Sequence, residues 1–361
     1  MLLALAIFNG LLAVATLLPL WRHPHYLVRG WDFPRRQIAV ALMAAITVQL
    51  VAGRWHSPAE LIVLGVAVLS AVVQLWWIAP YFTMAPNEVA RARDQDRQRS
   101  IRLVTGNVLQ TNRRADDFLA LVRQADPDIV IALEADTWWQ AKLDELETEG
   151  YTHTMKCPLD NLYGMVVYSR LPFSGATTEF LIEDGIPSMH AIVTLRSGEK
   201  VRLHVLHPPP PSPSENETSR TRDAELVIVA KSVRHARLPA IVTGDLNDVA
   251  WSETTRLFRK ISGMLDPRVG RGTFSSYHAK YPFMRWPLDH LFHSRHFCLN
   301  EIHRLAEFGS DHFPLLIDLQ LDDTQSDKND DGISADAEEH AWATEKTDEK
   351  NVDAGDVPKP N

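Results

Sequence analysis

Three long apolar runs dominate the N-terminal part of the chain. They extend from Leu2 to Leu20, from Ile38 to Ala52 and from Leu61 to Ile78. A helix of roughly 20 apolar residues crosses the hydrocarbon core of a bilayer, and the second run is the shortest. Buried core helices of a soluble protein are the alternative, but such helices usually keep one polar face, and these runs have none. We therefore predict that residues 1–84 form a transmembrane segment of about three helices.

A cleaved signal peptide is another interpretation of the first run, but signal peptides begin with a basic region. Here Met1 is followed directly by Leu2 and Leu3. Arginines are frequent between the first and second runs and after the third, whereas the second loop has only Arg54. Cytoplasmic loops are enriched in Arg and Lys, although large domains can be translocated regardless of flanking charge. We predict a multi-pass protein of a bacterial inner membrane. The charges of the loops favour the cytoplasm for residues 101–321, and the opposite side of the membrane is the alternative.

Two charged segments flank the central part of the chain. Residues 85–100 lack an apolar face, and we interpret them as a juxtamembrane linker. Residues 322–361 carry 13 acidic and 4 basic residues, with Trp342 as their only aromatic. Such a segment buries too little apolar surface to offset the entropy lost on ordering. We predict that it is an acidic, disordered tail.

The tail contains a match to a calcium-binding loop. Asp327, Asn329, Asp331, Gly332 and Glu338 have the spacing that places oxygen ligands around a turn requiring glycine. An acidic tail also produces this spacing by chance, and no apolar helix flanks the match. Both a Ca²⁺ site and a chance match remain open.

Residues 101–321 alternate between apolar runs of strand length and helical patterns, which predicts an α/β domain. Many polar residues stand at or just after the strand ends, where a sheet offers side chains to a cleft. Buried carboxylates and amides are costly unless they are paired or bound to metal, and hard oxygen ligands suit Mg²⁺ or Mn²⁺. Taken singly, each residue is equally well a cap or a turn residue. The candidates are Asn107, Glu134, Asp245, Asn247, Asp289, Asp311 and His312.

Six short motifs, in this order, give these residues a common context. Together they resemble the endonuclease/exonuclease/phosphatase family over nearly all of residues 101–321, and the resemblance implies a four-layered α/β sandwich, two packed β-sheets flanked by helices. The motifs are Gly106-Asn107-Val108-Leu109, Leu133-Glu134, Val167-Tyr168-Ser169-Arg170, Gly244-Asp245-Leu246-Asn247-Asp248, Pro287-Leu288-Asp289-His290-Leu291-Phe292 and Gly309-Ser310-Asp311-His312-Phe313-Pro314.

The resemblance also implies roles for individual residues. Asn107, Glu134 and Asp311 match metal-binding positions. Asp245 matches the residue that orients or deprotonates the attacking water, and Asn247 its phosphate-contacting partner.

Two histidines complete the implied site. His312 matches the catalytic histidine, which is supported by Asp289. His207 matches a histidine that phosphatase and sphingomyelinase branches place on a phosphate oxygen, where DNA-repair members tend to have tyrosine. The family's acid near the first asparagine is not evident, because Val108 and Leu109 follow it, so the number of metal ions stays open.

These features predict a membrane-anchored, Mg²⁺- or Mn²⁺-dependent phosphoesterase whose substrate is lipid-linked or otherwise close to the bilayer. A bound metal would neutralise the phosphate while water attacks in line. The chain has a net charge of -9, and residues 101–321 contain 24 basic and 28 acidic residues, so no basic footprint for nucleic acid is visible. A nuclease with a local basic groove and a catalytically inactive membrane adaptor are the alternatives. The complete residue set argues against the adaptor.

Overall fold

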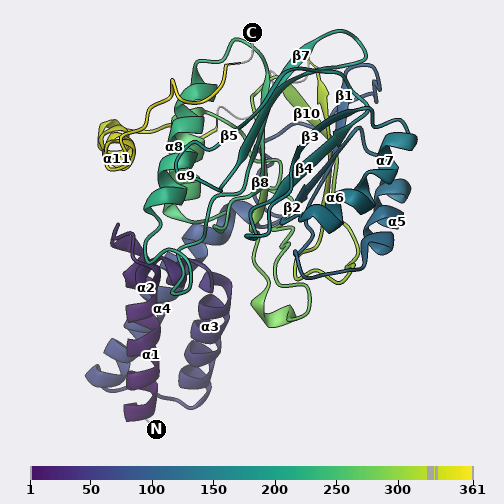
Figure 1. Ribbon diagram of the computed structural model, residues 1–361. Helices are drawn as coiled ribbons and strands as arrows, with labels where there is room; N and C mark the ends of the chain where they lie inside the picture. The colour runs from purple at the N-terminus through teal and green to yellow at the C-terminus, as the bar shows by residue number, and fades with distance from the viewer. Residues whose placement is uncertain (1, 323–328, 330–331, 360–361) are drawn as a thin grey trace.

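The computed structural model describes residues 2–322, 329 and 332–359. Its N-terminal part is a bundle of three helices that pack against one another (Figure 1). The bundle helices are α1 (Leu2–Leu17), α3 (Arg35–Val51) and α4 (Pro58–Ile78), with the short α2 (Tyr26–Arg29) in the first loop. Within the described residues, two helical stretches are long and apolar enough to cross a membrane, Leu2–Leu20 and Pro58–Tyr81. The helix α3 has 17 residues, and a third spanning helix is not confirmed.

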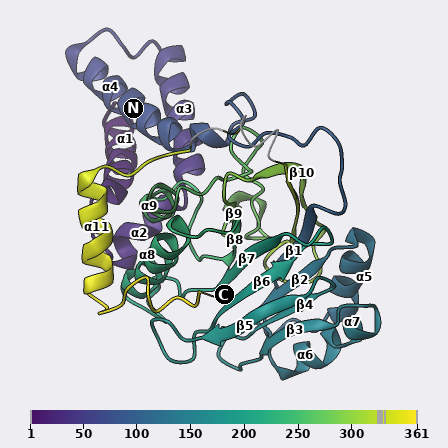
Figure 2. The same cartoon turned by 90° about the horizontal axis from the view of Figure 1, so that it is seen from above.

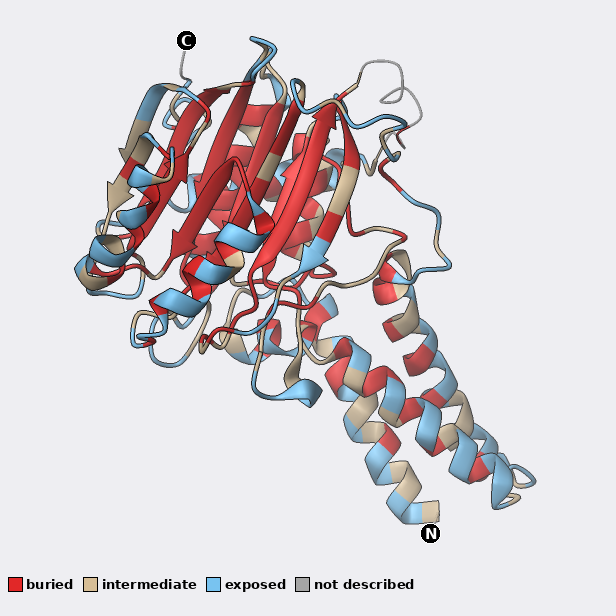
Figure 3. Ribbon diagram, turned by 90° about the vertical axis from the view of Figure 1, so that its right-hand side faces the viewer, coloured by how far each residue is buried: buried red, intermediate tan, exposed pale blue. Residues whose placement is uncertain are grey.

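The bundle buries polar as well as apolar side chains in its interior and leaves many apolar residues exposed on its outside. Gln74 donates from Nε2 to Thr16 Oγ1 at 3.0 Å, and Arg35 pairs with Asp32 at 2.7 Å, all of them buried. In contrast, Val40 and Leu69 are 70% and 69% exposed. Figure 3 shows this exposed surface along the helices beside the buried sheets of the remaining chain.

Two β-sheets form the centre of the second domain and pack face to face (Figure 2). The six-stranded sheet has the order β10-β11-β1-β2-β4-β3, and the five-stranded sheet has the order β5-β6-β7-β8-β9. Strands β1 and β2 are parallel, as are β7 and β8. The bounds are β1 (Ser100–Asn107), β2 (Ile129–Leu133), β3 (His153–Cys157), β4 (Met165–Ser169), β5 (Phe173–Glu179), β6 (Ser188–Thr194), β7 (Lys200–Leu206), β8 (Ala240–Asp245), β9 (Asp289–His293), β10 (Phe297–Arg304) and β11 (Leu315–Leu321).

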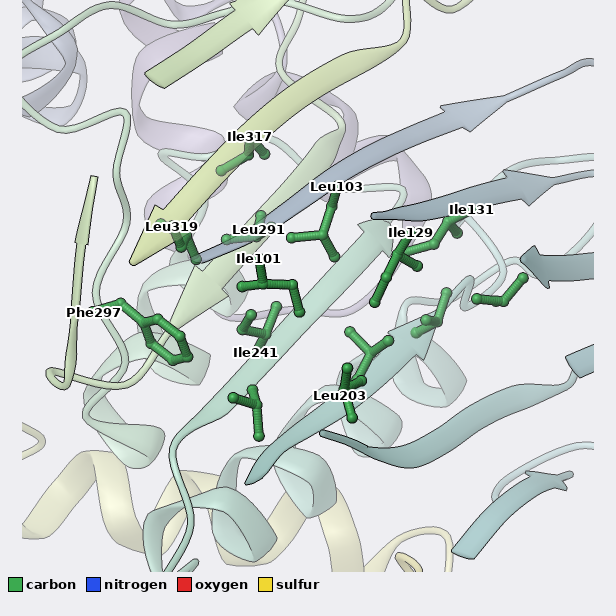
Figure 4. Packing of buried hydrophobic residues seen from close by; sticks show 14 of the residues in the cluster. Ile101, Leu103, Ile129, Ile131, Leu203, Ile241, Leu291, Phe297, Ile317 and Leu319 are labelled. Carbon is green, nitrogen blue, oxygen red and sulfur yellow. The ribbon is translucent and has the colours of Figure 1, made fainter. Parts of the chain in front are cut away.

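Apolar residues between the sheets form the main core (Figure 4). Alternate residues of each strand point into it, among them Ile131 from β2 and Leu203 from β7. Helices cover the outer faces: α5 (Ala115–Ala125), α6 (Thr137–Leu143) and α7 (Glu145–Thr148) on the first sheet, α8 (Arg220–Arg234) and α9 (Glu253–Ser262) on the second. The predicted four-layered sandwich is confirmed.

The segment predicted as a linker is instead packed onto the domain. Val89 is fully buried in the main core. Glu88 is also buried; it pairs with Arg259 of α9 and accepts from the backbone N–H of Asp266 at 2.9 Å. The prediction of a spacer over residues 85–100 is therefore wrong, because its few apolar and acidic side chains find partners that the local sequence does not reveal.

The bundle and the domain share a buried contact. Ala39 of α3 and Ile78 of α4 join Trp251 and Leu288 of the domain in one apolar cluster. The Trp251 indole Nε1 donates to the carbonyl of Asp32 at 2.8 Å. The two parts are thus held together by side-chain packing as well as by the chain.

The predicted disorder of the tail is wrong where the tail is described. Helix α11 (Ala337–Asp348) begins with a capping box formed by Asp336 and Glu339 and packs on α8 and α9. Ala343 is buried in the apolar cluster of those helices, and Lys346 pairs with the buried Asp223 at 2.5 Å. The tail orders because α8 supplies the apolar surface and the carboxylate that the tail itself lacks.

The predicted calcium loop is only partly described, because Asp327 and Asp331 lie outside the described residues. The Asn329 amide donates to the carbonyls of Arg295 and Phe297, and its oxygen accepts from the N–H of Ala90 at 2.7 Å. Glu338 pairs with Arg22 at 2.6 Å. These two side chains therefore serve contacts that hold the tail to the rest of the protein.

Candidate active site

The ends of strands from both sheets bring the predicted residues together. Asn107 is the last residue of β1, and Glu134 directly follows β2, the parallel neighbour of β1. Asp245 ends β8 in the second sheet. The Asn107 amide Nδ2 donates to Glu134 Oε1 at 2.6 Å and to Asp245 Oδ2 at 3.2 Å. One buried amide therefore links the two sheets at the site.

Glu134 is held in an uncommon backbone conformation. Its φ is 59°, in the left-handed region where residues other than glycine are rare and cluster at functional sites. Burial raises the pKa of the carboxyl to about 7, although the hydrogen bond from Asn107 acts in the opposite direction. A cation at this position would return the group to its charged form.

The segment after β8 is a tight turn. A Cβ on Gly244 would lie 1.9 Å from the carbonyl oxygen of Leu206, so only glycine fits between β7 and β8. Asn247 has a φ of 50°, and its backbone N–H donates to Asp245 Oδ1 at 2.9 Å. The buried Arg222 donates to the Asn247 carbonyl at 2.8 Å. This turn, and not strand alternation, places Asp245 and Asn247 at one site.

His312 and Asp289 form a buried pair. Nδ1 of His312 lies 2.7 Å from Asp289 Oδ2, and Nε2 lies 3.6 Å from Asp245 Oδ2. Burial alone would lower the pKa of His312, but the charges of Asp289 and Asp245 outweigh it and raise the pKa to about 10. The Tyr277 ring packs against the imidazole with centroids 4.9 Å apart. The ring orientation is thus fixed from three sides.

His207 directly follows β7 and is buried. Its Nε2 lies 3.9 Å from Asp245 Oδ2, and its ring centroid is 5.3 Å from that of Tyr163. The next carbonyl, of Pro208, accepts from the Asn247 amide at 3.0 Å. Burial lowers the pKa of His207 even with Asp245 nearby. A neutral imidazole ring still offers one N–H donor to a phosphate oxygen.

These side chains line a pocket of about 340 Å³. Glu134, His207, Asp245, Asn247, Asp311 and His312 contribute to its surface. Asn107 contacts the pocket carboxylates, and Asp289 supports His312 by the bond to its Nδ1. The structure thus brings together all eight predicted residues; their roles stay predictions.

Sequence reasoning missed several residues of the pocket wall, among them four aromatic or acidic residues from the loops. Phe33 comes from the loop before α3, and Trp286 from the loop that precedes β9. Tyr163 and Glu215 also line the pocket and are joined by a hydrogen bond from the Tyr163 hydroxyl. None of the four ends an apolar strand, so no periodic signal marks them.

The donor set fits a divalent metal ion. Glu134, Asp245 and Asp311 place carboxylates around one pocket, and no Lys or Arg lines it among the residues that the structure describes. Potential ligand atoms of Asp245, Asp289 and His312 also lie within 4.8 Å of one another. Asp289 Oδ2 is already bonded to His312 Nδ1, whereas Glu134, Asp245 and Asp311 line the pocket with carboxylate oxygens that could hold the ion. Such oxygen ligands suit Mg²⁺ or Mn²⁺.

The sequence matches the model of the Endonuclease/Exonuclease/phosphatase family over residues 104–312, more than half of the chain. The chain belongs to this family. Members of the endonuclease/exonuclease/phosphatase family are generally hydrolases of phosphoester bonds and typically use a divalent metal. Among curated proteins, none matches the sequence.

Solved structures of the family share the fold at low identity. An endonuclease/exonuclease/phosphatase from Beutenbergia cavernae is 20% identical, with a TM-score of 0.50, 62% of this chain covered and 72% of that one. A family protein from Bacteroides thetaiotaomicron is 17% identical, with a TM-score of 0.51 and coverages of 62% and 98%. TDP2 from D. rerio, complexed with a single-strand DNA product, is 16% identical, with a TM-score of 0.51 and coverages of 61% and 99%.

Proposed function

We propose that this protein is a membrane-anchored, Mg²⁺- or Mn²⁺-dependent phosphoesterase that hydrolyses a phosphate ester carried by a lipid. One observation carries the proposal: a residue from the N-terminal apolar part of the chain lines the pocket that holds the predicted catalytic residues. Phe33, which precedes α3, lines the same pocket as Asp245 and His312. A substrate in this pocket therefore lies beside the residues that lead into a membrane segment.

The exposed apolar surface of the bundle supports the membrane anchor. Soluble proteins rarely leave large contiguous apolar surfaces exposed, yet the outer faces of α1, α3 and α4 carry Leu11, Val40, Ile62 and Leu69, all at least 64% exposed. In lipid, such faces are in their preferred solvent, and polar residues turn toward the bundle interior. On the charge count of the loops, the catalytic domain lies on the cytoplasmic side.

The chemistry follows from the positions of the side chains. Glu134 and Asn107, with Asp245 and Asp311, would hold the metal, which when bound neutralises charge on the phosphate. Asp245 lies between His207 and His312, where it can orient a water molecule in line with the phosphorus. His312, held at Nδ1 by Asp289, directs Nε2 to the pocket to donate to phosphate or to move a proton. His207 would donate an N–H to a phosphate oxygen.

The pocket argues against the nuclease alternative. No Lys or Arg lines it among the described residues, and Glu215 adds a carboxylate to its rim. Phosphate backbones are gripped mainly by Arg and Lys, so the pocket wall itself offers no basic contact to a polyanion. An inactive adaptor would have no need for the complete set of residues around Asp245.

Activity on a panel of substrates tests the proposal. A lipid phosphate ester, a soluble phosphodiester and plasmid DNA are each incubated with full-length protein, with Mg²⁺ or with EDTA. We expect the lipid ester to be hydrolysed fastest and only with metal. Glu134→Ala should reduce the rate by about 1,000-fold, as for loss of a group that stabilises transition-state charge. The exposed Glu145→Ala is the matched control. Activity in EDTA, or in Glu134→Ala, would refute the metal role, and preferred cleavage of DNA would favour the nuclease.

The role of His207 separates the substrate branches. We expect His207→Ala to lose about 100-fold in rate, since an electrostatic donor to the transition state is typically worth this much. His207→Tyr should not restore it, because a bound phosphate anion favours the protonated imidazole, whereas the tyrosine hydroxyl stays neutral. A tyrosine variant that gains DNA cleavage would revive the nuclease alternative.

A further inference from the structure

A second cavity among the described residues is larger than the catalytic pocket. It is a groove of about 840 Å³ between α3 and the domain. One wall is the face of α3 that carries Arg36, Val40 and Ala44. The other wall comes from the hairpin around the short helix η4 (Pro282–Met284), which Figure 1 shows beside α3. Gln37 of α3 donates to the carbonyl of Phe283 at 2.7 Å, so the two walls are joined at one end.

Three arginines face this groove without an acidic partner among the described residues. We call Arg36, Arg285 and Arg304 the groove arginines. Arg36 donates to Thr273 Oγ1 at 3.2 Å, and Arg304 to the carbonyl of Ser275 at 3.0 Å. These neutral acceptors leave the positive charges uncompensated, whereas most other arginines of the domain pair with carboxylates.

Two of the groove arginines are held close together. The guanidinium groups of Arg285 and Arg304 both lie over the ring of Phe313, at 5.2 and 4.3 Å from its centroid. Burial, and the neighbouring charge of Arg285, lower the pKa of Arg304. Like charges so placed repel each other, and an anion bound between them would relieve the repulsion. Planar guanidinium groups are the preferred partners of phosphate oxygens.

The groove is also apolar along its bundle side. Val40 is 70% exposed, and Met43, Val48 and Val51 continue the exposed apolar surface of α3 away from the domain. The arginines stand at the domain end of this surface. A ligand that fits must therefore carry its anionic group at one end and apolar chains along the other.

We propose that the groove binds an anionic phospholipid of the surrounding bilayer, with its headgroup phosphate on the groove arginines and its acyl chains along α3. This site is separate from the metal-binding pocket, and the inference rests on the proposed membrane attachment. A third hollow lies between the groove and the metal-binding pocket, and its lining includes Phe33, Gln37, Phe283 and Trp286. It shares Gln37 and Phe283 with the groove and Phe33 and Trp286 with the catalytic pocket. A lipid in the groove therefore borders the route into the active site.

Native mass spectrometry of the full-length protein tests the site. Protein in nonionic detergent is mixed with equal amounts of phosphatidylglycerol and phosphatidylcholine. We expect wild-type protein to retain phosphatidylglycerol selectively and Arg304→Gln to bind it about tenfold more weakly, as expected for one lost charge-assisted hydrogen bond. The triple variant R36Q/R285Q/R304Q should lose the selectivity, and Arg304→Lys should keep most of it. The matched control is R97Q/R114Q/R123Q, which removes three surface arginines that pair with carboxylates.

Three outcomes would overturn the lipid site. Equal retention of both lipids by wild type is one, and unchanged selectivity in the groove variant is another. The third is stabilisation of wild-type protein by inorganic phosphate as strong as that by phosphatidylglycerol, which would assign the groove to a free anion. Membrane fractionation keeps this test apart from the proposed function. Wild-type protein that is not recovered with membranes counts against the anchor, whereas protein that stays in membranes with an unselective groove counts against the lipid site alone.

Discussion

The bundle and the catalytic domain differ in which side chains they bury and which they expose. In the domain, Ile131 and Leu203 are fully buried between the sheets. In the bundle, Val40 and Leu69 face outward, while Thr16 and Gln74 meet inside. Apolar burial drives folding in water, but between helices in lipid it offers little gain, so close packing and hydrogen bonds hold such helices together. One chain thus contains segments suited to two solvents, and the same substitution should have different effects in each.

The largest effect should occur where the two parts are joined. Glu88→Ala removes the partner of the buried Arg259 and the acceptor of the Asp266 N–H. An unpaired buried charge typically costs about 3–5 kcal/mol, and we expect a loss of this size in denaturant unfolding of full-length protein. Glu199→Ala, at the partly exposed pair with Arg99, should cost less than about 1 kcal/mol. A chain shortened to begin at Gln98 lacks Glu88 and Val89 and should be destabilised more than one that begins at Ala85.

A matched pair of substitutions to alanine compares a buried apolar residue of the domain with an exposed apolar residue of the bundle. Ile131→Ala should destabilise the domain by about 3 kcal/mol, because it leaves a cavity between the sheets. Leu69→Ala, on the outer face of α4, should change the unfolding free energy in detergent by less than about 0.5 kcal/mol. If Leu69→Ala proves as costly as Ile131→Ala, then α4 is covered by protein, and the membrane interpretation of its outer face fails.

A buried carboxyl in the domain should make stability depend on pH. Burial raises the pKa of Glu225 in α8 from its usual value near 4.5 to about 8, and its Oε1 has no hydrogen-bond partner within the described residues. The folded state therefore holds a proton that the unfolded state releases. This contribution is complete below pH 4.5 and is lost as the pH rises to about 8.

Glu225→Gln should remove this dependence. At pH 8 we expect the variant to be more stable than wild type by at least about 1 kcal/mol, or about 3 °C in Tm. Below pH 4.5 the two should coincide, and the exposed Glu183→Gln should follow wild type throughout. Parallel melting curves for Glu225→Gln and wild type at all pH values would contradict the assignment.

The smallest effects concern single hydroxyl groups. Thr243→Val removes a hydrogen bond of 2.8 Å to the carbonyl of His290 in the domain core and should cost about 1 kcal/mol. Thr16→Val removes the contact to Gln74 in the bundle and should cost about 0.6 kcal/mol, the usual value between membrane helices. Thermal unfolding of full-length protein in mixed micelles measures both. If Thr16→Val costs more than Thr243→Val, the hydrogen bond inside the bundle stabilises the protein more than the one in the domain core, contrary to this expectation.

Site residues and structural elements could be predicted where the signal lies in the neighbouring sequence. Asn107, Glu134 and Asp245 could be found because each stands at the end of an apolar strand. The turn that fixes Asn247 depends on the close approach of β7 to Gly244, which no pattern in the sequence reveals. Tyr163 and Glu215 come from separate loops and meet only in the folded chain. The tail was predicted to be disordered because its own sequence is poor in apolar residues. It is ordered where it is described because it packs on the apolar surface of α8 and α9 and pairs with Asp223.

The contact between Trp251 and Asp32 has a consequence for kinetics. The indole and the shared apolar cluster fix the domain on the bundle, so if the bundle is embedded as proposed, the pocket stays at a constant height above the bilayer. Catalysis would then be confined to a thin layer parallel to the membrane. The relevant variable becomes the surface density of the substrate, in molecules per area of lipid, and diluting the substrate with neutral lipid should slow turnover at constant bulk concentration.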